Sequence, residues 1–156
     1  MNSSRRTLLK GTIAAGVAGI AVGAGLLTPN VVLAAWPKDA FGAKNVDSAV
    51  SSLLGSSSLS ASGDITIKAP PIAENGAVVN VAVSTKLKNV ESISLLVEKN
   101  GTPLAGSFNL AAQTEPFIKT RIKVSKTSSV IAVVKSGGKL YSAGREVKVT
   151  IGGCGG

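Results

Sequence analysis

The 156-residue chain contains no histidine and a single cysteine, Cys154, and these two shortages exclude much of protein chemistry. Without histidine there is no imidazole base, no histidine metal ligand and no Ser/His/Asp triad. One cysteine can form neither a disulfide within the chain nor a multi-cysteine zinc or iron–sulfur site. We therefore expect this chain to hold no metal and no cofactor.

Aromatic side chains are also scarce, although the chain is basic. The net charge is +9, from 17 lysine and arginine and 8 aspartate and glutamate residues. A basic chain can bind nucleic acid, but stacking on single strands needs a platform of aromatic rings. We expect no nucleic-acid partner, because the aromatic residues are only Trp36, Phe41, Phe108, Phe117 and Tyr141.

The acidic side chains are few and dispersed, and no spacing between them suggests a catalytic acid–base pair. Gly137-Gly138 is no phosphate loop, because it does not stand between a strand and a helix. We expect no catalytic residue and no enzymatic activity of the chain's own. The carboxylates lie at Asp39, Asp47, Asp64, Glu74, Glu91, Glu98, Glu115 and Glu146.

The first 34 residues have the pattern of an export signal. Arg5 and Arg6 are followed by Leu-Leu-Lys, then by a glycine-rich apolar stretch, then by small residues up to Ala34. A paired arginine before such a stretch is typical of the twin-arginine route, which exports folded proteins. The alternative is a membrane anchor, which the short, glycine-diluted stretch disfavours. We expect residues 1–34 to be removed and the mature protein to be periplasmic.

Residues 35–63 are predicted to form a short helix and a linker. We expect residues 36–45 to be extended, with Asn45 capping a helix that ends at Gly55. Residues 56–63 have the serine-rich composition of a flexible linker. We expect the apolar stripe of the helix to pack on its own domain rather than on a partner. Its members are Val46, Ala49, Val50, Leu53 and Leu54.

After Gly63 the apolar period changes from 3.6 to 2, which predicts β-strands. Turn residues such as Pro70-Pro71 and Ser136–Lys139 separate the strands, and the second of these predicts a hairpin. About seven or eight short strands without crossover helices predict an all-β fold, an antiparallel β-sandwich of immunoglobulin type over residues 64–151. The runs are 65–68, 77–84, 93–98, 104–110, 118–124, 130–134, 140–143 and 147–151.

One predicted strand carries a basic stripe. Lys119, Arg121 and Lys123 alternate along it, with Lys126 close behind, so the first three lie on one face. The stripe could dock an acidic partner or steer an anion. The simpler interpretation, which we favour at this point, is a solvent-exposed face whose lysines protect a sheet edge.

The cysteine lies outside the predicted sandwich. Cys154 follows the last strand in a tail of five residues, and four glycines leave its backbone free and its sulfur unobstructed. Such a thiol can enter a cleft of another protein, but no histidine is present to deprotonate it. The other possibilities are a disulfide-linked dimer through Cys154, or a thiol oxidoreductase, which would lack a resolving cysteine. The glycines are Gly152, Gly153, Gly155 and Gly156.

These residues together resemble the SoxY family, the sulfur-carrier subunits of the periplasmic Sox system for thiosulfate oxidation. The resemblance rests on the twin-arginine signal, the helix, the sandwich and above all the ending Val-Lys-Val-Thr-Ile-Gly-Gly-Cys-Gly-Gly. It extends to the segments at residues 72–79, 89–93, 96–100 and 107–110.

The resemblance implies a carrier that other enzymes process. Cys154 would hold the sulfur intermediate covalently on a swinging arm formed by residues 152–156. The partner subunit would be a SoxZ-like immunoglobulin-like protein, exported together with this chain as a heterodimer. A SoxAX-like haem enzyme would join thiosulfate to the thiol, and a SoxB-like dimanganese hydrolase would release sulfate. In some organisms a SoxCD-like sulfane dehydrogenase oxidises the remaining sulfur. The competing class is an exported interaction module whose cysteine forms an intermolecular disulfide.

Overall fold

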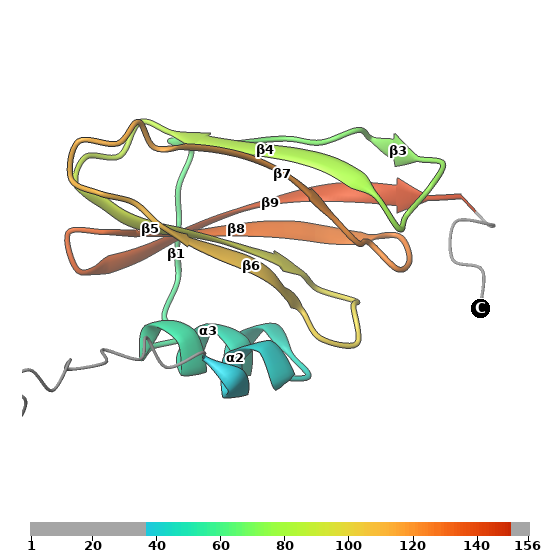
Figure 1. Cartoon of the computed structure of the whole chain (residues 1–156), viewed down its shortest axis with the longest axis horizontal. Helices are drawn as coiled ribbons and strands as arrows, with labels where there is room; N and C mark the ends of the chain where they lie inside the picture. The colour runs from blue at the N-terminus through green and yellow to red at the C-terminus, as the bar shows by residue number, and fades with distance from the viewer. Residues whose placement is uncertain (1–36, 151–156) are drawn as a thin grey trace, which may run out of the picture. The chain divides into compact units, whose positions relative to one another are not determined.

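The computed structural model describes residues 37–150, in which two β-sheets pack face to face (Figure 1). The larger sheet has the strand order β1-β9-β8-β5-β6, with β3 also paired to β9, and the smaller sheet has the order β2-β4-β7. The strands are β1 Ser60–Ala61, β2 Ile65–Lys68, β3 Ile72–Ala73, β4 Val79–Thr85, β5 Val90–Val97, β6 Leu104–Asn109, β7 Phe117–Ile122, β8 Ser128–Ser136 and β9 Lys139–Val149.

The predicted immunoglobulin-like sandwich is confirmed. The longer strands pair antiparallel, whereas β1 and β3, of two residues each, run parallel to β9. Because β2 lies between β1 and β3 in sequence but belongs to the other sheet, the chain changes sheets twice along the β9 edge. The two sheets are therefore linked along that edge by the chain itself.

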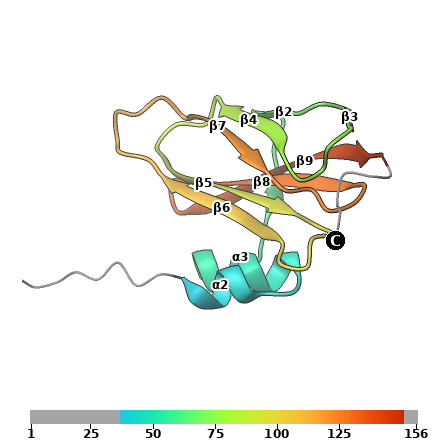
Figure 2. The ribbon, with the colours of Figure 1, turned by 45° about the vertical axis from the view of Figure 1, so that its right-hand side comes forward.

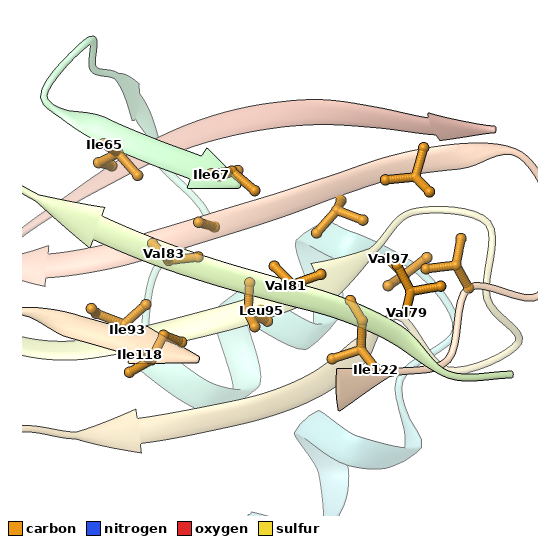
Figure 3. Close-up of a cluster of buried hydrophobic side chains, with 14 of the residues drawn as sticks. Ile65, Ile67, Val79, Val81, Val83, Ile93, Leu95, Val97, Ile118 and Ile122 are labelled. Carbon is orange, nitrogen blue, oxygen red and sulfur yellow. The ribbon is translucent and has the colours of Figure 1, made fainter. Parts of the chain in front are cut away.

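The core between the sheets follows the predicted alternation. In β4, Val79, Val81 and Val83 are buried while Asn80 is exposed. These valines face Ile93 and Leu95 of β5 across the sandwich (Figure 3). Each fully buried aliphatic side chain contributes roughly 1.5–3 kcal/mol. The inward rows of both sheets therefore hold the two layers together.

A second apolar cluster lies on the outer face of the larger sheet. Two helices, α2 (Lys38–Gly42) and α3 (Val46–Leu54), cover that face (Figure 2). Their packing on the sheet confirms that the helix docks on its own domain. The alternation alone would leave the side of β5 that carries Ser94 and Leu96 facing solvent, whereas both residues are buried on the face that the helices cover. The cluster contains Ala40, Ala49, Val50, Leu96, Leu104, Val133 and Leu140.

The ends of α3 are those that the sequence predicts. The Ser48 N–H donates to Asn45 Oδ1 over 2.8 Å, and Gly55 adopts a left-handed φ of 78°. The helix α2 was not predicted, since residues 36–45 were expected to be extended. Its few residues carry little periodic signal, and it is the burial of Ala40 against the sheet cluster that favours the helical form.

The linker prediction is wrong for residues 60–62. Ser60 and Ala61 form β1, in register with Tyr141 and Ser142 of β9, and the Ser62 N–H donates to the Ser142 carbonyl over 3.0 Å. A serine-rich composition describes how the isolated segment would behave. It contains no information about the sheet edge that accepts these hydrogen bonds.

The strand β9 is one continuous element of 11 residues, not the two strands predicted at 140–143 and 147–151. It pairs with β8 along its length, from Ser136↔Lys139 to Ser128↔Val147. The predicted hairpin joins them, and Gly137 and Gly138 supply its positive φ angles of 55° and 75°. No helix among residues 37–150 is long and apolar enough to cross a membrane.

Candidate functional site

The residues that the sequence singles out for chemistry lie outside the described part of the chain. Cys154 and its four glycines, Gly152, Gly153, Gly155 and Gly156, follow the last described residue, Thr150, and Arg5 and Arg6 precede the first. What the structure does describe is the platform from which the tail leaves. We call the segments around the end of β9 the arm root: residues 71–76, 123–127 and 148–150.

On one side of the arm root, β3 holds the end of β9. Ile72 and Ala73 are in parallel register with Lys148 and Val149. The Lys148 N–H donates to the Pro71 carbonyl over 3.0 Å, and the Thr150 N–H donates to the Ala73 carbonyl over 3.2 Å. The chain is therefore hydrogen-bonded up to the last described residue.

On its other side the end of β9 is tied to the segment that follows β7. The Val149 N–H donates to Thr127 Oγ1 over 3.0 Å. The buried Gly76 fills the space between this strand and the neighbouring segment, and its carbonyl accepts from the Val124 N–H over 2.7 Å. A side chain at Gly76 would collide with the Val124 carbonyl and with Val149, so glycine is required there.

The anchoring limits where the thiol can go. Cys154 is the fourth residue after Thr150. At 3.3–3.6 Å per residue the Cys154 backbone can reach at most about 14 Å from the root. A partner that handles the thiol must therefore sit close to this end of the sandwich.

The basic stripe is placed where the sequence predicts it, on an exposed edge strand. Lys119 and Arg121 are exposed on β7, and β7 is an edge of the smaller sheet. Lys123 and Lys126 follow in the arm root and are also exposed. The pairing of strands adds Lys68 of β2, which lies in line with Lys119 across Ala82.

The ion pair found in the described part of the chain lies at the other end of β9. Lys135 Nζ is 2.8 Å from Glu91 Oε2, and the Gly138 N–H donates to Glu91 Oε1 over 3.0 Å. The hydrogen bond from Lys135, and next that from Gly138, lower the pKa of Glu91 below its usual value. Within residues 37–150 no cluster of histidine, cysteine and carboxylate side chains is suited to a metal ion.

Sequence reasoning missed most of the arm root. Residues 74–76 lie between two predicted strands, and nothing in them signals the contact with Val124 and Val149. Nothing local marks Thr127 as the partner of Val149, which is 22 positions away. The atoms that a side chain at Gly76 would strike, those of Val124 and Val149, are likewise distant from it in sequence. No sequence signal was available for these contacts, because they are formed only when the two sheets close.

The immunoglobulin-like sandwich, with Cys154 four residues beyond a strand end that is held by hydrogen bonds, is the architecture of a small carrier or interaction module. Comparison with known proteins specifies the class. The family model of the sulfur oxidation protein SoxY matches residues 50–154, which include Cys154. This chain belongs to the SoxY family.

A solved relative supports the same assignment. The structure of the sulfur carrier protein SoxY from Chlorobium limicola f thiosulfatophilum is 41% identical, with a TM-score of 0.63. The alignment covers 74% of this chain and 100% of that chain. Membership of this family gives the chain a sulfur-carrier role in sulfur oxidation, in association with other proteins of the Sox system.

More distant matches add nothing to this assignment. A chain from a study of T cell activation by toxic shock syndrome toxin-1 is 8% identical, with a TM-score of 0.39, over 55% of this chain and 99% of that chain. That similarity carries no argument. No curated protein matches the sequence.

Proposed function

We propose that Cys154 is the covalent attachment site of a thiosulfate-derived sulfur intermediate, and that residues 152–156 form the arm that presents it to partner enzymes. The observation that carries the proposal is the family match to residues 50–154, which ends on the chain's one thiol. The hydrogen-bonded arm root supports it, because a fixed starting point gives a five-residue tail a defined region to search.

The loading step is an oxidation. The Cys154 sulfur and the outer sulfur of thiosulfate form a bond, the thiol proton passes to solvent, and two electrons pass to the oxidising partner. By resemblance that partner is a SoxAX-like haem enzyme. Water then cleaves the terminal sulfonate as sulfate on a SoxB-like dimanganese hydrolase, which leaves a persulfide on Cys154. A SoxCD-like sulfane dehydrogenase would oxidise the remaining sulfur.

The division between carrier and catalyst follows from what the chain contains. A thiol reacts as its thiolate, and thiolates form beside histidine, lysine or a helix N-terminus. The chain has no histidine, and the tail around Cys154 consists of glycine. Activation of the sulfur is therefore a task for the partner, and the carrier alone has no turnover.

The carrier is proposed to work in the periplasm as a heterodimer. Arg5 and Arg6 direct export by the twin-arginine route, and residues 1–34 are removed. A SoxZ-like immunoglobulin-like subunit, exported with this chain, would explain a route that carries folded proteins. Ile72 and Val78 support such an interface, because their side chains are 56% and 51% exposed.

The intact mass of the mature protein tests the attachment site. After incubation with thiosulfate and the oxidising haem enzyme, the wild-type chain should gain one thiosulfate group, whereas Cys154→Ser should gain none and should block oxidation in a reconstituted system. Wild-type protein alkylated at its one thiol is the matched control and should behave like Cys154→Ser. If Cys154→Ser supported thiosulfate oxidation at the normal rate, the proposal would be wrong. Disulfide-linked dimers without any thiosulfate adduct would favour the interaction module instead.

A further inference from the structure

The smaller sheet presents a basic outer face. Along β7 the outward residues are Phe117, Lys119 and Arg121, and the inward residues Ile118 and Ile122 are buried. Register across the sheet aligns Lys68 of β2 with Ala82 and then Lys119, and aligns Asn80 with Arg121. We call the exposed residues Lys68, Lys119, Arg121 and Lys123 the basic face.

On the outward face of β2, β4 and β7 no acidic side chain stands among these cations. The other outward residues of the three strands are Thr66, Asn80, Ala82, Ser84 and Phe117, and none of them is acidic. Within residues 37–150 the basic face has no ion-pair partner, since the described ion pair is Lys135–Glu91. Edge protection needs charge but not charge of one sign, and mixed signs would avoid the mutual repulsion. Clustered positive charge on an open face favours an acidic partner.

The shape of the face indicates a protein partner rather than a free anion. Phe117 is 47% exposed beside Lys119, and its β4 partner is the small residue Ser84. A shallow depression is lined by Asn80, Lys119, Thr120 and Arg121. Phe117, Lys119 and Arg121 follow one another along the same face of β7. Exposed aromatic and arginine side chains are enriched in protein interfaces, whereas a small anion would gain nothing from the ring.

The basic face continues into the arm root. Lys123 belongs to both, and its carbonyl accepts from Asn100 Nδ2 over 2.8 Å. The next residue, Val124, bonds to Gly76, which also borders Val149 of β9. A protein docked on the basic face therefore lies next to the strand end from which the tail leaves.

We propose that the basic face docks the acidic surface of an enzyme that acts on Cys154, holding that enzyme within reach of the arm. This inference rests on the proposed carrier function. Docking by charge raises the encounter rate and fixes orientation, while a weak and salt-sensitive complex still lets one carrier visit several enzymes.

Affinity measured without chemistry tests the docking surface. In the Cys154→Ser background, with any subunit that co-purifies, the triple variant Lys68→Glu/Lys119→Glu/Arg121→Glu is titrated by calorimetry with the oxidising haem enzyme. We expect its Kd at low ionic strength to rise at least about tenfold. The matched control, Lys38→Glu/Lys44→Glu/Lys139→Glu, changes the net charge equally through exposed lysines away from this sheet and should stay within about twofold.

Two results would overturn the proposal. Equal weakening in both triple variants would mean that only the net charge of the chain affects binding. An unchanged Kd in both would mean that the basic face does not bind the enzyme. Should the charge reversal unfold the chain, Lys119→Gln/Arg121→Gln must weaken binding in the same direction. A failure of the proposed carrier function would look different: the wild-type protein would bind the enzyme, but its mass would not increase by one thiosulfate group.

The anion alternative has its own measurement. To measure it, Cys154 is first converted to its mixed disulfide with thionitrobenzoate, a thiol that leaves readily. Excess thiosulfate then attacks the Cys154 sulfur without any enzyme, forming the same sulfur–sulfur bond and releasing the coloured thiolate. We expect the wild-type and the Lys68→Glu/Lys119→Glu/Arg121→Glu chains to react at rates within about twofold. Suppose instead that the triple variant reacts with thiosulfate more slowly than wild type by the same factor as its Kd for the enzyme rises. The basic face would then attract thiosulfate rather than dock an acidic protein.

Discussion

At Gly76 the geometry of the site depends on the absence of a side chain. Its carbonyl accepts from Val124, and a Cβ built on it would lie 2.8 Å from Val149 Cγ1 and closer still to the Val124 carbonyl. Backbone atoms cannot rotate away as a flexible side chain can. The separation between the β7 side and the β9 side of the arm root is therefore set by this one residue.

Replacing Gly76 by alanine should lower the free energy of unfolding by about 1–3 kcal/mol, because overpacking forces the surrounding backbone to shift. Urea unfolding followed by circular dichroism measures the change. Gly101→Ala is the matched control, since a Cβ there meets no atom within 4 Å, and it should be close to neutral. A Gly76→Ala chain as stable as wild type would show that the arm root is not tightly packed.

Glu91 gives the stability a pH dependence whose sign is fixed. Its pKa in the folded chain lies below the usual 4.5 because Lys135 and then Gly138 donate to the carboxylate. A lowered pKa stabilises the fold above the unfolded pKa, and the stabilisation is lost as the pH falls through the folded pKa. Glu91→Gln should therefore be slightly less stable than wild type at neutral pH, and the difference should shrink below pH 4.5.

Urea titrations of both proteins across that range measure the difference. We expect it to be small, because the two side chains are 37% and 45% exposed to solvent. Lys135→Gln should remove most of the same pH dependence, because Lys135 is the larger cause of the shift. A difference between wild type and Glu91→Gln that does not change with pH would contradict the assignment.

At the scale of the elements, α2 and α3 act as a cover for the outer face of the larger sheet. Val50 is 1% exposed and packs in the cluster that contains Leu96 and Val133. Beneath the cover the hydroxyls of Ser94 and Ser107 bond to each other over 2.9 Å, which satisfies two polar groups that would otherwise be costly to bury. The helices therefore complete the fold rather than wait for a partner.

Truncating Val50 to alanine should cost about 2 kcal/mol of unfolding free energy, from the lost transfer energy and the cavity that remains. Ser52→Ala, on the exposed side of the same helix, is the control and should stay within about 0.5 kcal/mol of wild type. Urea unfolding of the two variants checks the difference. Equal stability would mean that α3 is only loosely attached to the sheet.

The sequence predicted those elements whose signal lies in their own residues. The alternation in β2, β4 and β7 and the cap at Asn45 are local patterns, and the structure contains them. The strands β1 and β3 have two residues each, too few for a period to show, and exist because the edge of β9 accepts their hydrogen bonds. The covered face of β5 escaped prediction for a related reason, since helices far away in sequence bury it.

The candidate site divides in the same way. Cys154 can be named from the sequence because a lone cysteine among glycines is a chemical fact that needs no fold. The basic stripe on β7 could be named as well, but Lys68 joins it only through the pairing of β2 with β4 and of β4 with β7. The arm root could not be named, since Thr127 and Val149 are brought together only by the fold. The chemistry of a side chain can be predicted from the sequence, whereas its neighbours in space are known only from the structure.

At the scale of the whole molecule, the two sheets have separate tasks. The larger sheet has its inner face in the core and part of its outer face under the helices, and it ends in the strand that carries the tail. The smaller sheet leaves its outer face open and basic. The larger sheet therefore contributes mainly to stability, and the outer face of the smaller sheet is the one proposed to bind a partner. Changes to the outer face of the smaller sheet should alter binding without altering the fold, which is what makes charge reversal there a clean experiment.

The proposed export route connects the fold to its surroundings and can be tested in cells. Replacing Arg5 and Arg6 by lysine keeps the charge but removes the arginine pair, so the precursor should remain in the cytoplasm. Cell fractionation with mass determination of the N-terminus distinguishes this retained precursor from mature protein. Because the chain is proposed to leave the cytoplasm already folded with its SoxZ-like subunit, that signal-less subunit should be retained as well.

A matched variant separates the arginine pair from general charge. Lys10→Arg also exchanges one basic residue for another within the first ten residues and should leave export unchanged. Unchanged periplasmic yield of the Arg5→Lys/Arg6→Lys chain would refute the twin-arginine route. Retention of this chain while the subunit still reached the periplasm would instead refute joint export, because a folded heterodimer that shares one signal must cross the membrane as a unit or not at all.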